Sequence, residues 1–195
     1  FRGNCVIEIN GGSVNGTGKE NSAGIGAGEY GTVTINITGG KAEGQGAKRA
    51  AGIGSAYHSG ASAINISGGT VIGKAWPEQG DEGAGIGGGN NADTMIITIT
   101  GGTVEGYGGD AASGIGSGSD CVRPAKVYIR DGDVKGYGRQ RYAAGIGGGG
   151  DGAVVEISGG TVLAEAWNYA AGIGGGDSKH AGTILIFGGH VTAIG

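Results

Sequence analysis

Aromatic side chains occur together with amides and charged groups in several short segments spaced along the chain. The flat face of an aromatic ring covers the apolar C–H face of a pyranose, while neighbouring polar groups bind the sugar hydroxyls. This combination favours an extended glycan as ligand. The alternative is that each ring folds over its neighbour and shields glycine-rich backbone. The candidate ligand-binding residues are Trp76, Asp81, Tyr107, Asp110, Tyr137, Arg139, Tyr142, Trp167, Asn168 and Tyr169.

Glycine-rich turns that end in Asn or Asp form a second candidate site. Such turns occupy residues 87–90, 116–120, 147–151 and 174–177. Calcium takes about six to eight oxygen ligands, which adjacent turns of a stacked structure can supply together. The alternative is that Asn and Asp are present because they suit turns. The candidate calcium ligands are Asn90, Asp93, Asp120, Asp151 and Asp177.

Catalytic chemistry is less well supported by the sequence. Arg130, Asp131 and Asp133 form the best candidate cluster, but glycoside hydrolysis needs a matched pair of carboxylates and no second pair is placed nearby. The three histidines are isolated and no Cys-x-x-Cys occurs, which argues against zinc. We therefore expect a protein that is not an enzyme, with a polysaccharide-active enzyme as the remoter alternative.

Composition excludes several other classes of partner. The net charge is −4 and no basic run occurs, which argues against nucleic acid and against an anionic membrane surface. No apolar stretch approaches the roughly 20 residues that span a bilayer, so membrane insertion is not expected. Glycine supplies 52 of 195 residues, but without the triplet period of collagen.

Two interleaved motifs make the chain a repeat array and define the elements that must position these residues. Ala-Gly-Ile-Gly, once as Ser-Gly-Ile-Gly, places isoleucine at 25, 53, 86, 115, 146 and 173, at spacings of 28, 33, 29, 31 and 27 residues. A glycine pair begins at 11, 39, 68, 101, 159 and 188, and Asp131-Gly132 fills the remaining slot. Repeats of this length are single supersecondary units that bury their apolar faces by stacking on neighbours. We expect one repeat domain over residues 1–195.

Apolar columns appear when the repeats are aligned on the glycine pair. Apolar residues two positions apart lie on one face of a strand, while the polar residues between them face outward. Glycine pairs suit corners where φ is positive, and we expect Asp131 to adopt the left-handed region there. The first column is Ile7, Ile35, Ile64, Ile97, Val127, Val155 and Ile184, the second is Ile9, Ile37, Ile66, Ile99, Ile129, Ile157 and Ile186, and the third is Val14, Ala42, Val71, Val104, Val134, Val162 and Val191.

The columns predict an all-β fold, a right-handed parallel β-helix of about seven coils with three short strands per coil. The segments before each Gly-Ile-Gly vary in length, and so do those after it. We expect the preceding segments to stack along a first edge of the solenoid and the following segments to stack along a second edge. The aromatic candidates, including Tyr107 and Tyr137, fall in the segments of the first edge, and the calcium candidates fall in those of the second. Cys5 and Cys121 lie four coils apart, about 19 Å at the usual strand spacing, so both thiols are predicted to be free.

Residues 143–149 and 155–162 resemble the glycine-rich parallel β-helix modules of large bacterial cell-surface and secreted proteins. Some members of that group are described as carbohydrate-binding, so the resemblance implies an extracellular or cell-surface location and an adhesin-like role. We therefore expect a non-enzymatic module that binds polysaccharide along its aromatic edge. The main alternative is a structural module that stacks end to end into a fibre, because neither end of the repeat array carries an evident cap.

Overall fold

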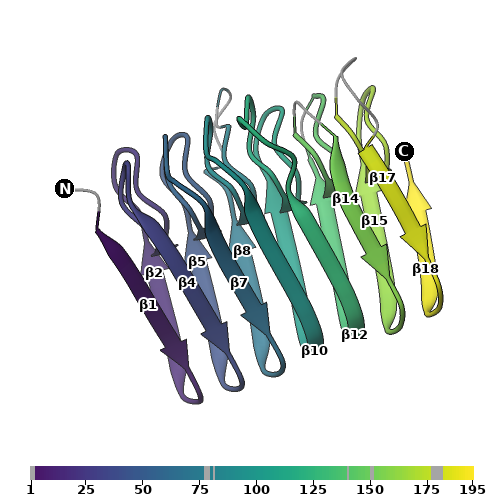
Figure 1. Ribbon diagram of the computed structural model, residues 1–195, viewed down its shortest axis with the longest axis horizontal. Helices are drawn as coiled ribbons and strands as arrows, with labels where there is room; N and C mark the ends of the chain where they lie inside the picture. Colours follow the sequence, from purple (N-terminus) through teal and green to yellow (C-terminus); the bar gives the residue numbers. More distant parts are fainter. Residues whose placement is uncertain (1–2, 77–79, 81, 140, 150–151, 177–181) are drawn as a thin grey trace.

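Alternation of β-branched and polar residues produces short strands that stack coil upon coil into a flattened solenoid (Figure 1). The computed structural model describes residues 3–76, 80, 82–139, 141–149, 152–176 and 182–195. Among these residues every regular element is a strand, and the strands of successive coils pair in parallel, so the predicted parallel β-helix is confirmed. One isolated antiparallel bridge joins Ala143 to Trp167. No helix in this part of the chain has the length and apolar character needed to cross a membrane.

Three faces run along the solenoid. Face 1 lies in front in Figure 1 and face 2 lies behind it, and the tight corners at the bottom of the view join them. Face 1 contains β1 (Asn4–Ile9), β4 (Thr32–Ile37), β7 (Ser62–Ile66), the first half of β10 (Met95–Gly108), the first half of β12 (Lys126–Gly138), β14 (Ala153–Ile157) and β17 (Gly182–Ile186). Face 2 contains β2 (Ser13–Thr17), β5 (Lys41–Gln45), β8 (Thr70–Lys74), the second halves of β10 and β12, β15 (Thr161–Ala166) and β18 (His190–Ile194). Face 3 contains the two-residue strands β3 (Ile25–Gly26), β6 (Ile53–Gly54), β9 (Ile86–Gly87), β11 (Ile115–Gly116), β13 (Ile146–Gly147) and β16 (Ile173–Gly174).

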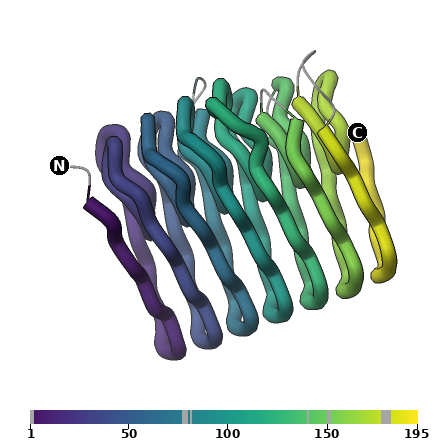
Figure 2. Tube along the Cα trace, viewed as in Figure 1, coloured from purple at the N-terminus to yellow at the C-terminus, as the bar shows by residue number. Residues whose placement is uncertain are grey.

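The strand counts give about six turns. Face 3 has six strands, whereas faces 1 and 2 continue into a seventh coil with β17 and β18. The predicted three short strands per coil are present in the first, second, third and sixth coils. In the fourth and fifth coils β10 and β12 run through the corner and serve both faces, and the seventh coil contributes β17 and β18. Figure 2 shows the coils following one another with little change of shape.

The predicted apolar columns are paired residue by residue between coils. Ile35 pairs with Ile7 and Ile64, and the same register continues to Ile184. In the middle coils these side chains are fully buried, as are the isoleucines of the Gly-Ile-Gly motif. The core is therefore a set of stacked aliphatic ladders that runs the length of the solenoid.

The glycine-pair corners correct one prediction. In each pair the second glycine has positive φ, for example 78° at Gly40 and 109° at Gly132. Asp131 occupies the first position and its φ is not positive, so the expectation that it adopts the left-handed region was wrong. It fits instead because the register with β10 shifts at this corner, and its Oδ1 accepts a hydrogen bond from Gly132 N at 2.8 Å.

The Gly-Ile-Gly glycines allow backbones to approach closely. Gly116 has φ of 141°, and a Cβ there would lie 1.9 Å from the carbonyl oxygen of Gly147 in the next coil. Faces 2 and 3 also meet through glycine, since a Cβ on Gly106 would lie 2.2 Å from the Gly114 oxygen. Cys5 and Cys121 form no disulfide, as the coil spacing predicted; Cys5 is exposed, and Cys121 is buried with its Sγ 3.5 Å from the Gly89 carbonyl oxygen.

Candidate ligand-binding groove

A groove of 650 Å³ crosses the ends of the face 2 strands where they meet the first edge. We call it the aromatic groove. Its volume lies within the usual range for ligand sites, and it combines aromatic surface with a few polar groups. Its lining residues are Gln45, Lys74, Ala75, Trp76, Tyr107, Gly108, Arg139 and Trp167.

Strand register assembles the groove from five successive coils, and Gln45 of the second coil pairs with Lys74 of the third. Lys74, Tyr107, Tyr137 and Glu165 are paired neighbours on face 2. Two residues further along, their coils carry Trp76, Gly109, Arg139 and Trp167 in the same order. In the groove lining, Tyr107 and Gly108 of the fourth coil and Arg139 of the fifth lie between the tryptophans of the third and sixth coils.

Tyr107 forms the centre of this arrangement. Its ring stacks on that of Tyr137, with centroids 4.9 Å apart and planes 7° apart, because the stacking distance of the coils matches that of aromatic rings. The guanidinium of Arg139 lies 4.4 Å from the Tyr107 centroid. Burial raises the pKa of Tyr107 to about 12, and the hydrogen bond from its hydroxyl to Glu105 Oε2 at 2.8 Å acts in the same direction. The hydroxyl therefore stays protonated throughout the physiological range.

Lys74 and Gln45 complete the groove on its N-terminal side. Lys74 Nζ lies 2.7 Å from Glu43 Oε1, and Lys41 Nζ lies 3.0 Å from the other carboxylate oxygen. Hydrogen bonds from Lys74 and then Lys41 lower the pKa of Glu43. Gln45 Nε2 donates to the Ala75 carbonyl at 2.6 Å, which holds the amide against the next coil.

Sequence reasoning missed Gln45 and Lys74. Both stand six residues after the first glycine of the pair, the position that Tyr107 and Tyr137 occupy in their own repeats. The repeat register therefore marks this position as part of the site, although glutamine and lysine are not aromatic.

The structure brings together only part of the predicted aromatic set. Trp76, Tyr107, Arg139 and Trp167 line the groove, and Tyr137 supports it through its stacked ring. The placement of Tyr107 and Tyr137 in edge segments was wrong, because both belong to strands and point outward from face 2. Four further candidates are absent from the groove lining, and Asp81 lies outside the described residues. The four are Asp110, Tyr142, Asn168 and Tyr169.

Tyr142 and Tyr169 form a separate pair on the first edge. Their ring centroids are 6.2 Å apart, the ring planes are tilted by 32°, and Tyr169 is 83% exposed.

Trp167, at the end of the aromatic groove, is 55% exposed, and its indole Nε1 donates to Glu165 Oε1 at 3.1 Å. Trp167 thus presents much of its surface to solvent while its polar atom is held in place.

Three of the five calcium candidates, Asn90, Asp93 and Asp120, lie among the described residues, in the segments that follow Gly-Ile-Gly. Asn90 is buried, and its Oδ1 accepts a hydrogen bond from the side-chain Nδ2 of Asn91. Asp93 Oδ1 accepts from Thr94 N at 2.7 Å and lies 3.6 Å from Arg123 Nε. Asp120 Oδ2 accepts from Ser119 Oγ at 3.2 Å. Asp151 and Asp177 lie outside the described residues, and within those residues no cluster of three His, Cys, Asp or Glu side chains suits a metal ion.

The candidate catalytic cluster lies at the corner between faces 1 and 2. Asp131 binds its own turn, and Asp133 Oδ2 lies 3.5 Å from Lys135 Nζ, which also contacts Glu105. The neighbouring Asp133 carboxylate is the main cause that raises the pKa of Lys135. None of these residues lines the aromatic groove.

Comparison with known proteins identifies the repeat but no complete relative. A family model described as a beta helix repeat matches residues 7–29 and 155–177, each close to one coil in length. These matches and the stacked coils support a parallel β-helix repeat family. No curated protein and no solved structure matches the chain.

Proposed function

We propose that this chain is a non-enzymatic, extracellular or cell-surface module that binds polysaccharide in the aromatic groove. The observation that supports the proposal is the arrangement of Trp76, Tyr107 and Trp167 around one groove together with polar groups from Gln45 and Arg139. Ring faces suit the apolar side of a sugar, and amide and guanidinium groups suit its hydroxyls.

The direction of the groove favours a linear ligand. It extends from the second coil, with Gln45, to the sixth, with Trp167, a path of about 19 Å at the usual strand spacing. A smaller hollow continues it toward the N-terminus and shares Gln45 and Lys74 with it. A glycan chain that lies along the solenoid axis would contact one coil after another.

The test is binding of the purified chain to an array of polysaccharides, followed by calorimetry on Trp76→Ala/Trp167→Ala. Loss of both indoles is expected to lower the affinity for the bound polysaccharide about tenfold or more, because ring stacking is removed. Tyr169→Ala is the matched control, since it removes an exposed ring that does not line the groove.

Three outcomes of this test are informative. Unchanged affinity in the double tryptophan variant would place the site elsewhere, and no binding to any glycan would contradict the function. The array is repeated with a calcium chelator. Loss of binding in its presence would show that binding requires calcium and would implicate the Asp-bearing turns.

A second candidate function is end-to-end assembly. Ile184 and Ile186 belong to columns that are fully buried in the middle coils, yet they are 42% and 52% exposed in β17. The N-terminal coil carries the same columns in β1, with Ile7 and Ile9. Two copies could therefore continue each other's ladders, with β17 of one pairing with β1 of the next.

A further inference from the structure

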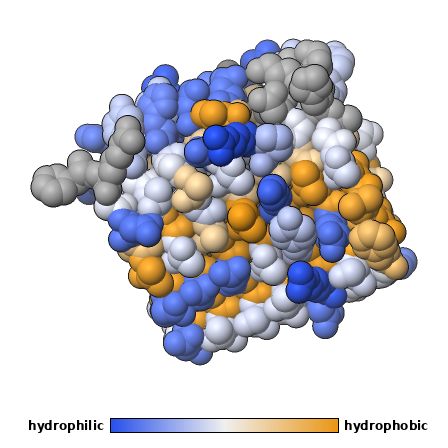
Figure 3. Space-filling view, viewed as in Figure 1, coloured by the Kyte–Doolittle hydropathy of each residue, from blue (hydrophilic) through white to orange (hydrophobic). Residues whose placement is uncertain are grey.

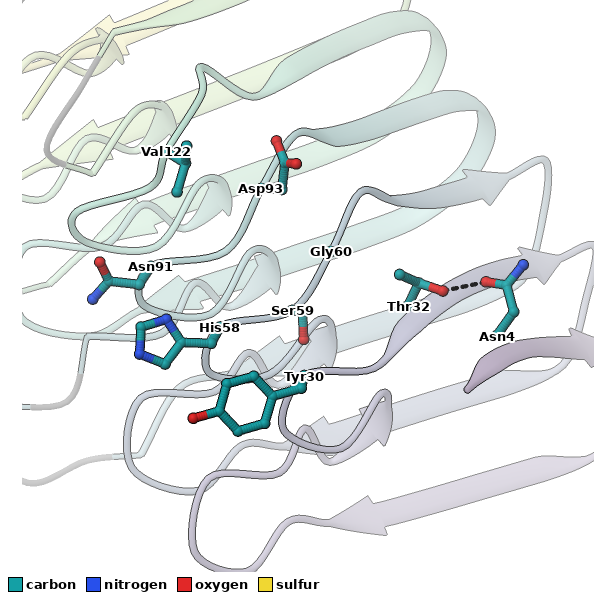
Figure 4. A pocket seen from close by; sticks show the side chains of 9 residues that line it. All are labelled: Asn4, Tyr30, Thr32, His58, Ser59, Gly60, Asn91, Asp93 and Val122. Atoms are coloured by element: carbon teal, nitrogen blue, oxygen red, sulfur yellow. Dashed lines mark hydrogen bonds between the residues drawn. The ribbon is translucent and has the colours of Figure 1, made fainter. Parts of the chain in front are cut away.

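A second groove, of 490 Å³, lies on the second edge, between face 3 and the start of face 1 (Figure 4). We call it the second-edge groove. It is separated from the aromatic groove by face 3 and shares no lining residue with it. The residues that line it are Asn4, Tyr30, Thr32, His58, Ser59, Gly60, Asn91, Asp93 and Val122.

One wall of this groove is a row of side chains from the same turn position in successive coils. Tyr30, His58 and Asn91 each stand five residues after the isoleucine of a Gly-Ile-Gly motif, and their φ angles are 62°, 53° and 53°. Backbone hydrogen bonds stack the turns, with Tyr30 N donating to Tyr57 O at 3.2 Å and His58 N to Asn90 O at 3.1 Å. Figure 4 shows the three side chains one after another along the row, with Thr32 and Asn4 across from Tyr30.

The rings in this row are held in place. Tyr30 and His58 are parallel within 7°, with centroids 5.6 Å apart, and Tyr57 packs on His58 at 3.9 Å. Arg49 in turn lies 5.1 Å from the Tyr57 centroid. Because Tyr30 is 50% exposed at the end of this stack, its ring can contact a ligand without first having to be ordered.

The rest of the lining supplies hydrogen-bonding groups with little net charge. Thr32, Ser59 and Asn91 contribute hydroxyl and amide groups. The Asp93 carboxylate lies 3.6 Å from Arg123 Nε, which balances its charge, and Gly60 contributes no side chain to the lining. Ordered rings beside neutral donors and acceptors suit a neutral saccharide better than an ion or an apolar ligand.

We propose that the second-edge groove is a second saccharide-binding site, so that one chain holds two glycan segments and cross-links polysaccharide. The choice of ligand class rests on the proposed function, whereas the groove itself is independent of the first. Two sites on one rigid rod increase avidity for a polymer without any additional contact.

The test counts sites by calorimetry with cellohexaose, xylohexaose and chitohexaose as probes. For a probe that binds, we expect two sites on the wild-type chain and one on Tyr30→Gly/His58→Gly. Glycine suits positive φ, so this variant removes both rings while the turns are retained. Trp76→Ala/Trp167→Ala is also expected to keep one site, and each variant should lose the ability to make a solution of the matching polysaccharide turbid.

A blocking variant provides a second, independent test. A Cβ at Gly60 would meet only the Thr32 Cγ2 atom, at 2.7 Å, so Gly60→Phe places a ring in the second-edge groove once the Thr32 side chain shifts slightly. Gly28→Phe is its control, because a Cβ at Gly28 meets nothing within 4 Å and the residue does not line the groove. We expect Gly60→Phe, but not Gly28→Phe, to reduce two sites to one.

The variants separate failure of this inference from failure of the proposed function. A single wild-type site that survives Tyr30→Gly/His58→Gly and is lost in Trp76→Ala/Trp167→Ala would overturn the second-edge groove alone. A single site with the opposite response would support this groove and overturn the aromatic one. Absence of binding to all three probes and to the polysaccharide array would overturn both.

Discussion

At the scale of single residues, the aromatic groove depends on how Tyr107 is held. Its ring is fixed by Tyr137 and Arg139, and its hydroxyl by Glu105. A tyrosine whose folded pKa is raised stabilises the fold fully below the unfolded value of 10, and this contribution is lost as the pH rises through about 12. The groove should therefore keep its geometry at neutral pH and lose it in strong alkali.

Replacing Tyr107 by Phe tests this assignment. The ring stack should persist, but the tyrosine that ionises at about pH 12 should vanish from a spectrophotometric alkaline titration, because its hydroxyl is gone. Tyr169→Phe, which removes an exposed hydroxyl, should leave that late step in place. Persistence of the late step in Tyr107→Phe would show that another tyrosine accounts for it.

At the scale of elements, backbone contact between coils limits which residues the strands of face 3 can contain. The second glycine of each Gly-Ile-Gly has φ between 136° and 148°, and in the first five coils a Cβ there would lie 1.8 to 2.1 Å from the carbonyl oxygen of the same glycine in the next coil. A side chain at this position meets a steric cost and a conformational cost together. The two-residue strands of face 3 therefore depend on glycine more strongly than the strands of faces 1 and 2.

Gly116→Ala should accordingly destabilise the fold by about 3 kcal/mol or more, since strain at positive φ adds to overpacking against Gly147. Gly28→Ala is the control, because it has open space and no positive φ, and it should change stability by less than about 1 kcal/mol. Denaturant unfolding monitored by circular dichroism measures both. Similar midpoints for the two variants would show that the coils can move apart to admit a methyl group.

At the scale of the whole molecule, the two ends differ from the middle. Figure 3 shows apolar residues gathered at the C-terminal end of face 1, where Leu185 and Phe187 are exposed beside the open core columns. Strand edges with unpaired backbone groups and apolar columns favour pairing with a further coil. A second copy of this chain can supply such a coil, and the assembly hypothesis rests on this possibility.

Ile186→Asp should weaken that assembly, because it places a charge in the apolar column that the next copy would cover. Light scattering after size exclusion should give a mass that rises with concentration for the wild-type chain and stays monomeric for the variant. Thr183→Asp, on the outward side of the same strand, should assemble as the wild type does. A monomeric wild-type chain at all concentrations would remove the hypothesis.

The sequence alone determined the solenoid and its core. Ile35, Val104 and Ile115 could be placed in columns because the order of residues itself shows the alternation along a strand and the recurrence between repeats. The glycine pairs could be placed at corners for the same reason. Only the backbone geometry showed that Gly132, and not Asp131, has the positive φ at its corner.

Only the tertiary structure decided which side chains share a groove. Trp76 and Trp167 belong to coils three turns apart, and they line one groove because the parallel register stacks the ends of their face 2 strands along the same edge. The row of Tyr30 and His58 likewise depends on turns whose left-handed backbone was not evident from residue type. Strand periodicity is carried by neighbours in the sequence, whereas a groove across coils depends on stacking register and turn conformation, which are settled only when distant repeats pack together.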